Sequence, residues 1–174
     1  MAIQVAVRPA RLEDAAAIAE IYNQGIRARI ATFETEERTP EERRAWIAQH
    51  DERYPVVVAT IGEDGSERVV GWAGASPYSS RACYAGVAEF SIYIHEGERG
   101  KGIGSVLIDT FIAACERAGL WKLTSRIFPE NIASRTLCKK AGFEEIGIHR
   151  KHAQLDGVWK DNVIVERLIP ANQL

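Results

Sequence analysis

The chain has 174 residues, of which 46% are hydrophobic and 26% are charged, and its formal net charge is −2. This length suits one domain with a sizeable hydrophobic core, and we expect residues 1–174 to form it. The balanced charge and the absence of a Lys- or Arg-rich run argue against a nucleic-acid partner. The sequence shows neither an apolar stretch of membrane-spanning length nor the hydrophobic block of a signal peptide, so we expect no membrane association.

The cysteines and histidines argue against a disulfide framework and against a metal site. Three cysteines, an odd number, lie far apart at Cys83, Cys115 and Cys138. Their spacing matches no zinc motif and fits a reducing compartment, so we expect a cytoplasmic protein. The four histidines form no H-x-x-x-H pair, and His149 and His152 fit a solvated strand edge better than a pair of metal ligands.

The first half of the chain predicts two helices and three strands. Alternating residues at 3–7 indicate a strand, and apolar residues at helical spacing indicate an amphipathic helix over about 12–27. Thr39-Pro40-Glu41-Glu42 is typical of a helix start, with a capping hydroxyl, a proline and acidic residues in the first turn. Residues 56–61 and 69–75 are predicted strands, and Gly62-Glu63-Asp64-Gly65 between them indicates a hairpin.

The second half alternates strands with helices. A β-branched and aromatic run over 90–94 predicts a strand, which leads through a glycine-rich segment into a helix that ends at Gly119. A strand over 120–128, a helix over 131–141 and two strands from Phe143 onward follow. The predicted order is β-α-α-β-β-β-α-β-α-β-β, which indicates an α/β protein.

The segment Arg99-Gly100-Lys101-Gly102-Ile103-Gly104 lies between a predicted strand and a predicted helix. Glycines at this place let the backbone approach a ligand closely, and the first N–H groups of the helix have no partners within it. These donors and the positive end of the helix dipole favour a phosphate-type anion. The spacing matches neither the dinucleotide fingerprint G-x-G-x-x-G nor the phosphate-binding loop G-x-x-x-x-G-K-[ST]. The segment therefore predicts a site for another pyrophosphate-bearing cofactor.

Arg99, Gly102 and Gly104 match the pattern [RQ]-x-x-G-x-[GA]. With the strand before it and the helix after it, this segment resembles that of the GNAT superfamily of acyl-CoA-dependent N-acyltransferases, whose members wrap the coenzyme A pyrophosphate with this motif. The alternative is a glycine-rich turn that only joins strand to helix. The resemblance covers nearly the whole chain. It implies the GNAT fold, a mixed, mostly antiparallel sheet flanked by helices and splayed at the acetyl-CoA site.

The resemblance also implies where acetyl-CoA, the expected cosubstrate, would bind. The backbone of the Glu89 strand would pair with the pantetheine arm as if it were another strand, and the N–H groups of the glycine segment would hold the pyrophosphate. Asn131 matches an asparagine that commonly meets the pantetheine, although it would cap a helix in any protein. The expected cofactor-binding residues are Ile92, Tyr93, Ile94, Arg99, Gly100, Lys101, Gly102, Ile103, Gly104, Ser105, Asn131 and Ser134.

Glu89 is the candidate catalytic residue. It is a lone carboxylate in an otherwise apolar strand, Val87-Ala88-Glu89-Phe90-Ser91-Ile92-Tyr93-Ile94. A carboxylate there costs free energy unless it is paired, solvated or protonated. N-acetylation requires an amine that has lost its proton, and Glu89 would accept that proton directly or through a water molecule. The alternative is a structural salt bridge on an edge strand.

Within GNAT the chain is similar to the phosphinothricin acetyltransferase group, which acetylates the α-amine of analogues such as phosphinothricin and methionine sulfoximine. The resemblance implies that Glu89 is catalytic, that Phe33, Arg81 and Tyr84 contact the substrate, and that the chain forms a homodimer. The alternatives are a solvated loop charge for Arg81 and a core side chain for Phe33. The shared segments are Ile21-Tyr22-Asn23, Ala31-Thr32-Phe33-Glu34-Thr35, Arg81-x-x-Tyr84, Glu89 and Gly157-x-Trp159-x-Asp161.

One position departs from this pattern. Many GNAT enzymes carry a tyrosine, and the phosphinothricin group often a histidine, four residues before the Gly-Phe that closes the last helix. Cys138 occupies this place. A small buried thiol more often serves packing than proton transfer, so the identity of the general acid stays open.

We therefore expect an N-acetyltransferase that acts on the α-amine of a small amino acid or analogue with a polar head. Two alternatives stay open: acetylation of a peptide N-terminus, an aminoglycoside or another amine, and a non-catalytic sensor that binds acyl-CoA. An aminoglycoside would need a strongly acidic cleft, which Arg81 opposes. Retention of Glu89 beside an intact glycine motif disfavours the sensor.

Overall fold

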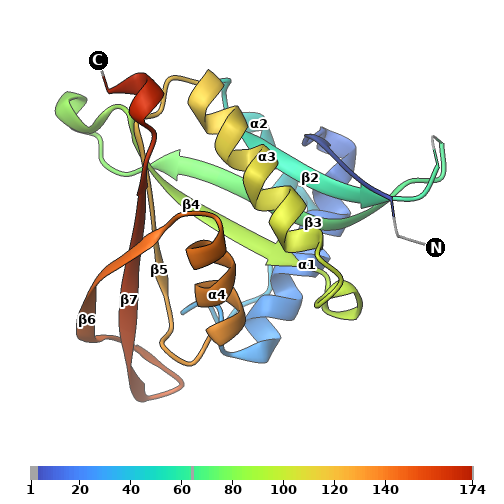
Figure 1. The fold of residues 1–174 in the computed structure, drawn as a ribbon. Helices are drawn as coiled ribbons and strands as arrows, with labels where there is room; N and C mark the ends of the chain where they lie inside the picture. The colour runs from blue at the N-terminus through green and yellow to red at the C-terminus, as the bar shows by residue number, and fades with distance from the viewer. Residues whose placement is uncertain (1–3, 64, 174) are drawn as a thin grey trace.

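The computed structural model describes residues 4–63 and 65–173. In this part of the chain seven strands form one sheet in the order β1-β2-β3-β4-β5-β7-β6 (Figure 1). β4 and β5 are parallel, and the other neighbouring strands are antiparallel. The strands are β1 (Val5–Pro9), β2 (Val56–Ile61), β3 (Arg68–Pro77), β4 (Val87–Ile94), β5 (Lys122–Ile127), β6 (Glu144–Leu155) and β7 (Val158–Leu168).

Helices cover both faces of this sheet. Successive residues of a strand point to opposite faces, and accordingly Trp72 packs with α1 and α2 whereas Ala73 packs with α3. Cys138 of α4 belongs to the same cluster as α3. Figure 1 shows α3 in front of β2, β3 and β4, with α1 and α2 behind them. The helices are α1 (Ala15–Ala28), α2 (Pro40–Gln49), α3 (Ile103–Arg117) and α4 (Ile132–Lys140). Among the described residues, no helix is long and apolar enough to cross a membrane.

The predicted helix start at Thr39 is confirmed, and two reciprocal hydrogen bonds explain it. The Thr39 hydroxyl accepts a hydrogen bond from the Glu42 backbone N–H at 3.1 Å, and the Glu42 carboxylate accepts one from the Thr39 N–H at 2.7 Å. Pro40 occupies the first helical position, where no N–H is needed. The capping residues therefore set the first residue of α2.

The predicted order of elements and the mixed, mostly antiparallel sheet are confirmed, with shifts at the ends of elements. β1 covers Val5–Pro9 rather than 3–7, and Ile3 lies outside the described residues, as does Asp64 of the hairpin turn. The first helix opens with a 3-10 turn over Leu12–Asp14, where the buried Asp14 carboxylate accepts hydrogen bonds from the Arg8 guanidinium.

The pairing between β4 and β5 is short, and this shapes the site. Three residue pairs form the ladder, of which Glu89 and Thr124 are the last, although β4 continues to Ile94 and β5 to Ile127. Beyond that point, residues of both strands line a cavity. β4 lies in the interior of the sheet between β3 and β5, so an edge-strand position for Glu89 is wrong.

Candidate active site

The glycine segment adopts a conformation that needs glycine at two positions. Gly100 and Gly102 have φ values of +76° and +82°, a region that residues with a Cβ rarely adopt. Gly104 has a different constraint, because a Cβ there would lie 3.2 Å from Cδ2 of Leu137 in α4. The left-handed turn at Gly102 directs the chain into α3, whose first N–H groups have no acceptor within the helix. The segment has the geometry of an anion cradle.

Charged side chains beside this cradle are already paired. The Glu98 carboxylate accepts hydrogen bonds from Lys101 at 2.9 Å and from Arg68 at 2.7 Å. These two partners lower the pKa of Glu98 to about 2. The Arg99 Nε–H donates to the Ile94 carbonyl at 3.3 Å. The Lys101 ammonium therefore faces Glu98, whereas Arg99 lines the adjoining cavity.

A cavity of about 350 Å³ extends from the glycine segment along β4 to α4. All the predicted cofactor residues except Lys101 line it. The other lining residues are Glu98, just before the glycine segment, and two groups of residues from α4 and from the end of α1 and the loop after it. Ala133, Thr136, Leu137 and Lys140 lie at offsets of three and four residues, so they form one stripe of α4 facing the cavity. The C-terminal part of α1 and the residues after it supply Gly25, Ala28, Ile30 and Ala31.

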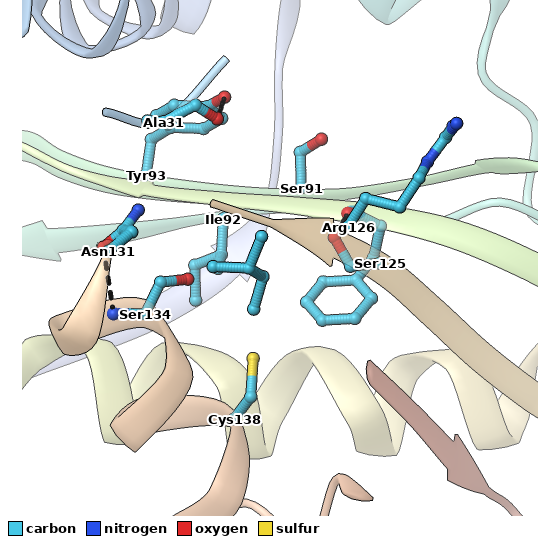
Figure 2. A pocket seen from close by; sticks show the side chains of 11 residues that line it. Ala31, Ser91, Ile92, Tyr93, Ser125, Arg126, Asn131, Ser134 and Cys138 are labelled. Carbon is cyan, nitrogen blue, oxygen red and sulfur yellow. Dashed lines mark hydrogen bonds between the residues drawn. The ribbon is translucent and has the colours of Figure 1, made fainter. Parts of the chain in front are cut away.

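Asn131 performs the capping role and lines the cavity as well. Its Oδ1 accepts a hydrogen bond from the Ser134 N–H at 3.2 Å, which caps the first turn of α4. Figure 2 shows its Nδ2 group pointing away from that hydrogen bond. The amide nitrogen thus stays available to a carbonyl of a ligand in the cavity.

Tyr93 contributes a wall between the cavity and the face covered by α1. Its ring stacks on Trp72 at 5.1 Å between centroids, and its hydroxyl lies 3.5 Å from the Ala31 carbonyl. Burial raises the pKa of the Tyr93 phenol. A Cβ on Gly25 would lie 2.7 Å from the Tyr93 ring, so glycine is what allows α1 to approach β4 so closely.

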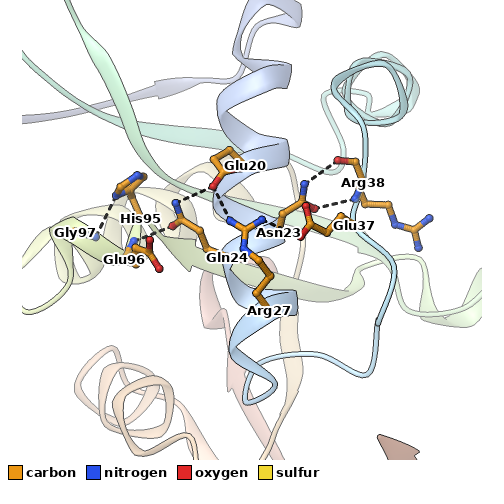
Figure 3. A network of polar contacts seen from close by, with 9 residues as sticks. All are labelled: Glu20, Asn23, Gln24, Arg27, Glu37, Arg38, His95, Glu96 and Gly97. Atoms are coloured by element: carbon orange, nitrogen blue, oxygen red, sulfur yellow. Dashed lines mark hydrogen bonds and ion pairs between the residues drawn. The ribbon is translucent and has the colours of Figure 1, made fainter. Parts of the chain in front are cut away.

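Two polar side chains of α1 connect this helix to both loops of the site (Figure 3). Gln24 accepts a hydrogen bond from the Glu96 N–H, just before the glycine segment, at 2.9 Å. Asn23 binds the backbone of Arg38, donating to its carbonyl at 2.9 Å and accepting from its N–H at 2.8 Å. Asn23, which belongs to one of the shared segments, therefore fixes the loop that carries Phe33.

A second, smaller cavity of about 70 Å³ lies where β4 and β5 stop pairing. It shares five lining residues with the larger cavity, among them Asn131 and Ser134, so the two adjoin. Figure 2 shows Ser91 and Arg126 on one side of the strands and Cys138 on the other. The large cavity therefore adjoins the gap between β4 and β5.

Glu89 forms a salt bridge, as the alternative interpretation of the sequence allowed, but with a partner that the sequence did not indicate. Nη2 of Arg126 donates to both carboxylate oxygens of Glu89, at 2.9 Å and 2.8 Å. The side chains of Glu89 and Arg126 are 37% and 45% exposed, so solvent and ligands reach the pair. Arg126 is separated from Glu89 by 37 residues and carries no motif of its own, and its position follows only from the register of β4 against β5.

Cys138 is 1% exposed and packs in the hydrophobic cluster around α3. Burial raises the pKa of its thiol to about 12, with a smaller contribution from the nearby Glu145 carboxylate. The side chain lines the small cavity from the face opposite Ser91 and Arg126. Its position matches that of a proton donor, but its environment makes the thiol a very weak acid.

The predicted substrate residues occupy two separate places. The half-buried Phe33 ring packs edge-on against Phe128, with 4.8 Å between centroids, close to the end of β5. Arg81 and Tyr84 lie together on the exposed loop before β4, with the guanidinium 5.6 Å from the tyrosine ring. Tyr78 packs against Tyr84. Neither cavity described above includes Phe33, Arg81 or Tyr84 in its lining.

Known proteins are similar to this chain in both fold and sequence. Residues 4–144 match the family described as an acetyltransferase (GNAT) domain. The phosphinothricin N-acetyltransferase of Streptomyces coelicolor is 34% identical over 164 residues, which cover 94% of this chain and 96% of that protein. The L-methionine sulfoximine/L-methionine sulfone acetyltransferase of Pseudomonas paraeruginosa is 29% identical over 160 residues, 91% of each chain.

A solved structure agrees with these relatives. The phosphinothricin acetyltransferase of Sinorhizobium meliloti, crystallised in complex with acetyl-CoA, has a TM-score of 0.86 and 29% sequence identity. The match covers 97% of this chain and 89% of that one. The glycine cradle and the cavity beside β4 agree with the family match and with these relatives. Together the family match and the relatives show that the chain belongs to the GNAT family and is an acetyl-CoA-dependent N-acetyltransferase.

Proposed function

We propose that this enzyme transfers the acetyl group of acetyl-CoA to the α-amine of a small amino acid or analogue of the phosphinothricin, methionine sulfoximine or methionine sulfone type. The observation that carries the proposal is the carboxylate of Glu89 at the last pair of the β4–β5 ladder, beside the gap that the large cavity adjoins. Relatives named for these acceptors support the substrate class.

The residues present fit acetyl-CoA. The open space around the left-handed Gly100 and Gly102 suits a pyrophosphate, and the elongated cavity along β4 suits the pantetheine arm. The backbone of Ile92 and Ile94 and the amide of Asn131 would bind the amides of that arm. When bound, acetyl-CoA supplies an acetyl group activated as a thioester.

Glu89 would remove the proton from the acceptor amine. A free Glu has a pKa of about 4.3 and an α-amine one of about 8, so direct proton transfer from the amine to Glu89 is uphill by roughly four pKa units. A water molecule between the two groups would shorten the distance over which each proton moves. The exposed position of the Glu89 carboxylate allows such a water to enter. The departing thiolate would take its proton from solvent or from the released amine proton, since the thiol of Cys138 is a poor donor at neutral pH.

The acceptor would approach from the sheet face that carries Glu89. Phe33 would wall the pocket from the α1–α2 loop, and Arg81 with Tyr84 would bind a polar or anionic head group, such as the phosphinate of phosphinothricin. An anionic acceptor suits an arginine on this loop, whereas polyamines and aminoglycosides do not.

The test is to incubate the enzyme with acetyl-CoA and a panel of amines and to measure the free thiol of coenzyme A that is released. The panel contains phosphinothricin, methionine sulfoximine, methionine sulfone, plain amino acids, a polyamine and an aminoglycoside. We expect turnover with the first three. Preference for the polyamine or the aminoglycoside would contradict the substrate class, and absence of thiol release with every amine would favour a sensor.

We also propose that the enzyme is a homodimer. The β6–β7 hairpin carries large apolar side chains at its surface, namely Ile146, Ile148, Val158 and Trp159, each more than half exposed. Large apolar side chains that stay exposed together on one hairpin are typical of an interface between protein chains. Light scattering should give twice the mass of 19.3 kDa, and a monomer at micromolar concentration would contradict this proposal.

A further inference from the structure

We propose that Arg126 binds the α-carboxylate of the acceptor, so that the Glu89–Arg126 ion pair is a receptor for a zwitterionic α-amino acid. The inference rests on the proposed function and adds a residue that determines specificity. It assigns the ammonium of the acceptor to Glu89 and its α-carboxylate to Arg126.

The register of the sheet places both side chains on one face. Glu89 is paired with Thr124 across the ladder, and Arg126 follows Thr124 by two residues, so all three side chains lie on the same side. Both Glu89 oxygens lie within 2.9 Å of Arg126 Nη2. Because each side chain of the pair is more than one third exposed, an acceptor can reach both charged groups without unfolding either strand.

Arg126 is also positioned where an acceptor must react. Among the described residues that line the small cavity between β4 and β5, it is the only charged one. That cavity adjoins the one assigned to acetyl-CoA. Arg81, in contrast, lies on an exposed loop with its guanidinium over the Tyr84 ring. Arg81 is therefore free for a charged head group at the far end of a longer acceptor.

Exchange of partners explains why a zwitterion fits. In the ion pair, the Glu89 carboxylate accepts hydrogen bonds from the Arg126 guanidinium, and each group neutralises the charge of the other. An α-amino acid carries both missing partners on one carbon, so its ammonium can replace the guanidinium at Glu89 while its carboxylate replaces Glu89 at Arg126. Arginine suits this role, since its planar donors match the two oxygens of a carboxylate. An amine without a carboxylate would separate the pair and leave Arg126 facing a second positive charge.

The test compares two acceptors that differ only in the α-carboxylate: methionine sulfone and the corresponding 3-(methylsulfonyl)propylamine. Wild type, Arg126→Gln and Arg126→Lys are assayed with both. Arg117→Gln serves as the control, because Arg117 is exposed in the last turn of α3, on the opposite face. The KM for acetyl-CoA and the thermal midpoint of each variant show whether the fold and the cofactor site are intact.

We expect Arg126→Gln to raise the KM for methionine sulfone roughly ten- to a hundredfold, the loss expected for a charged hydrogen bond. The KM for the decarboxylated amine should stay unchanged or fall, because this variant removes the positive charge that opposes the amine. Arg126→Lys keeps the charge but loses the planar donors, so its KM for methionine sulfone should lie between those of the wild type and Arg126→Gln. Equal losses with both acceptors would overturn the inference, because Arg126 would then act only through Glu89. Unchanged kinetics with both would overturn it as well. If wild type acetylates no amino acid, the proposed function itself fails and the inference with it.

Discussion

The cofactor side and the acceptor side of this site are built in different ways. On the cofactor side, residues 92–105 run continuously from β4 through the glycine segment into α3, and most of them line one cavity. On the acceptor side, Glu89, Arg126 and Phe33 come from a strand, a second strand and a loop that meet only in the folded protein. A binding site made of consecutive residues is fixed by local backbone geometry, whereas a site made of distant residues depends on sheet register and packing.

The largest effect should come from the residue where the two sides meet. Glu89→Gln keeps the shape of the side chain and removes the proton acceptor, so kcat should fall by about 10²–10⁴-fold. Calorimetry should show unchanged acetyl-CoA affinity. Glu145→Gln is the matched control, since Glu145 is also paired with an arginine, Arg135, at 2.7 Å. Full turnover of Glu89→Gln across the pH range would make Glu89 a structural residue.

The cofactor side should respond to changes in the backbone rather than in charge. Gly102→Val forces a β-branched residue into a left-handed conformation, which costs about 1–3 kcal/mol. If the bound state needs this conformation, the cost appears as a roughly five- to hundredfold loss of acetyl-CoA affinity. Gly104→Leu should weaken binding by pushing against Leu137. Gly147→Ala, in open space with an ordinary φ, is the control. Unchanged calorimetric affinity in both variants would remove the glycine segment from the cofactor site.

Arg81 should show a smaller, acceptor-dependent effect. Arg81→Ala removes an exposed cation, so the KM for phosphinothricin should rise roughly tenfold, at the low end of a charged hydrogen bond. The KM for acetyl-CoA should stay nearly unchanged. Methionine sulfone, whose head group is neutral, should respond less than phosphinothricin. If the two acceptors respond equally, Arg81 does not bind the head group.

Cys138 should matter least. Burial raises the pKa of its thiol to about 12, so the side chain is protonated at neutral pH and gives up its proton reluctantly. Cys138→Ala should reduce kcat by less than roughly tenfold, below the usual contribution of a general acid. A hundredfold loss in a variant that keeps its thermal midpoint would show instead that Cys138 delivers a proton.

The contrast between the two sides also explains what the sequence could predict. The cap at Thr39, the strand and helix periods and the glycine segment act over a few residues, and the elements that they predicted are present. The stripe of α4 at Ala133, Thr136 and Leu137 could have been found from its helical spacing, once the cavity was assigned to that face.

The partner of Glu89 could not be predicted in this way. Arg126 alternates with its neighbours as any strand residue does, and nothing in its own segment indicates which residue it faces. The contact exists because β5 pairs with β4 in parallel at one particular register. Likewise, the ring of Phe33 meets Phe128 because Asn23 holds the loop at Arg38, a contact over 15 residues.

The most direct test of the central claim is the position of the acetyl group on methionine sulfoximine, which carries an α-amine beside its carboxylate and a second nitrogen on sulfur. Tandem mass spectrometry and NMR of the product distinguish the two nitrogens. If the acceptor amine lies at Glu89 with the carboxylate at its side, the wild-type product is acetylated on the α-nitrogen alone. Acetylation of the sulfoximine nitrogen, or of neither nitrogen, would contradict the account.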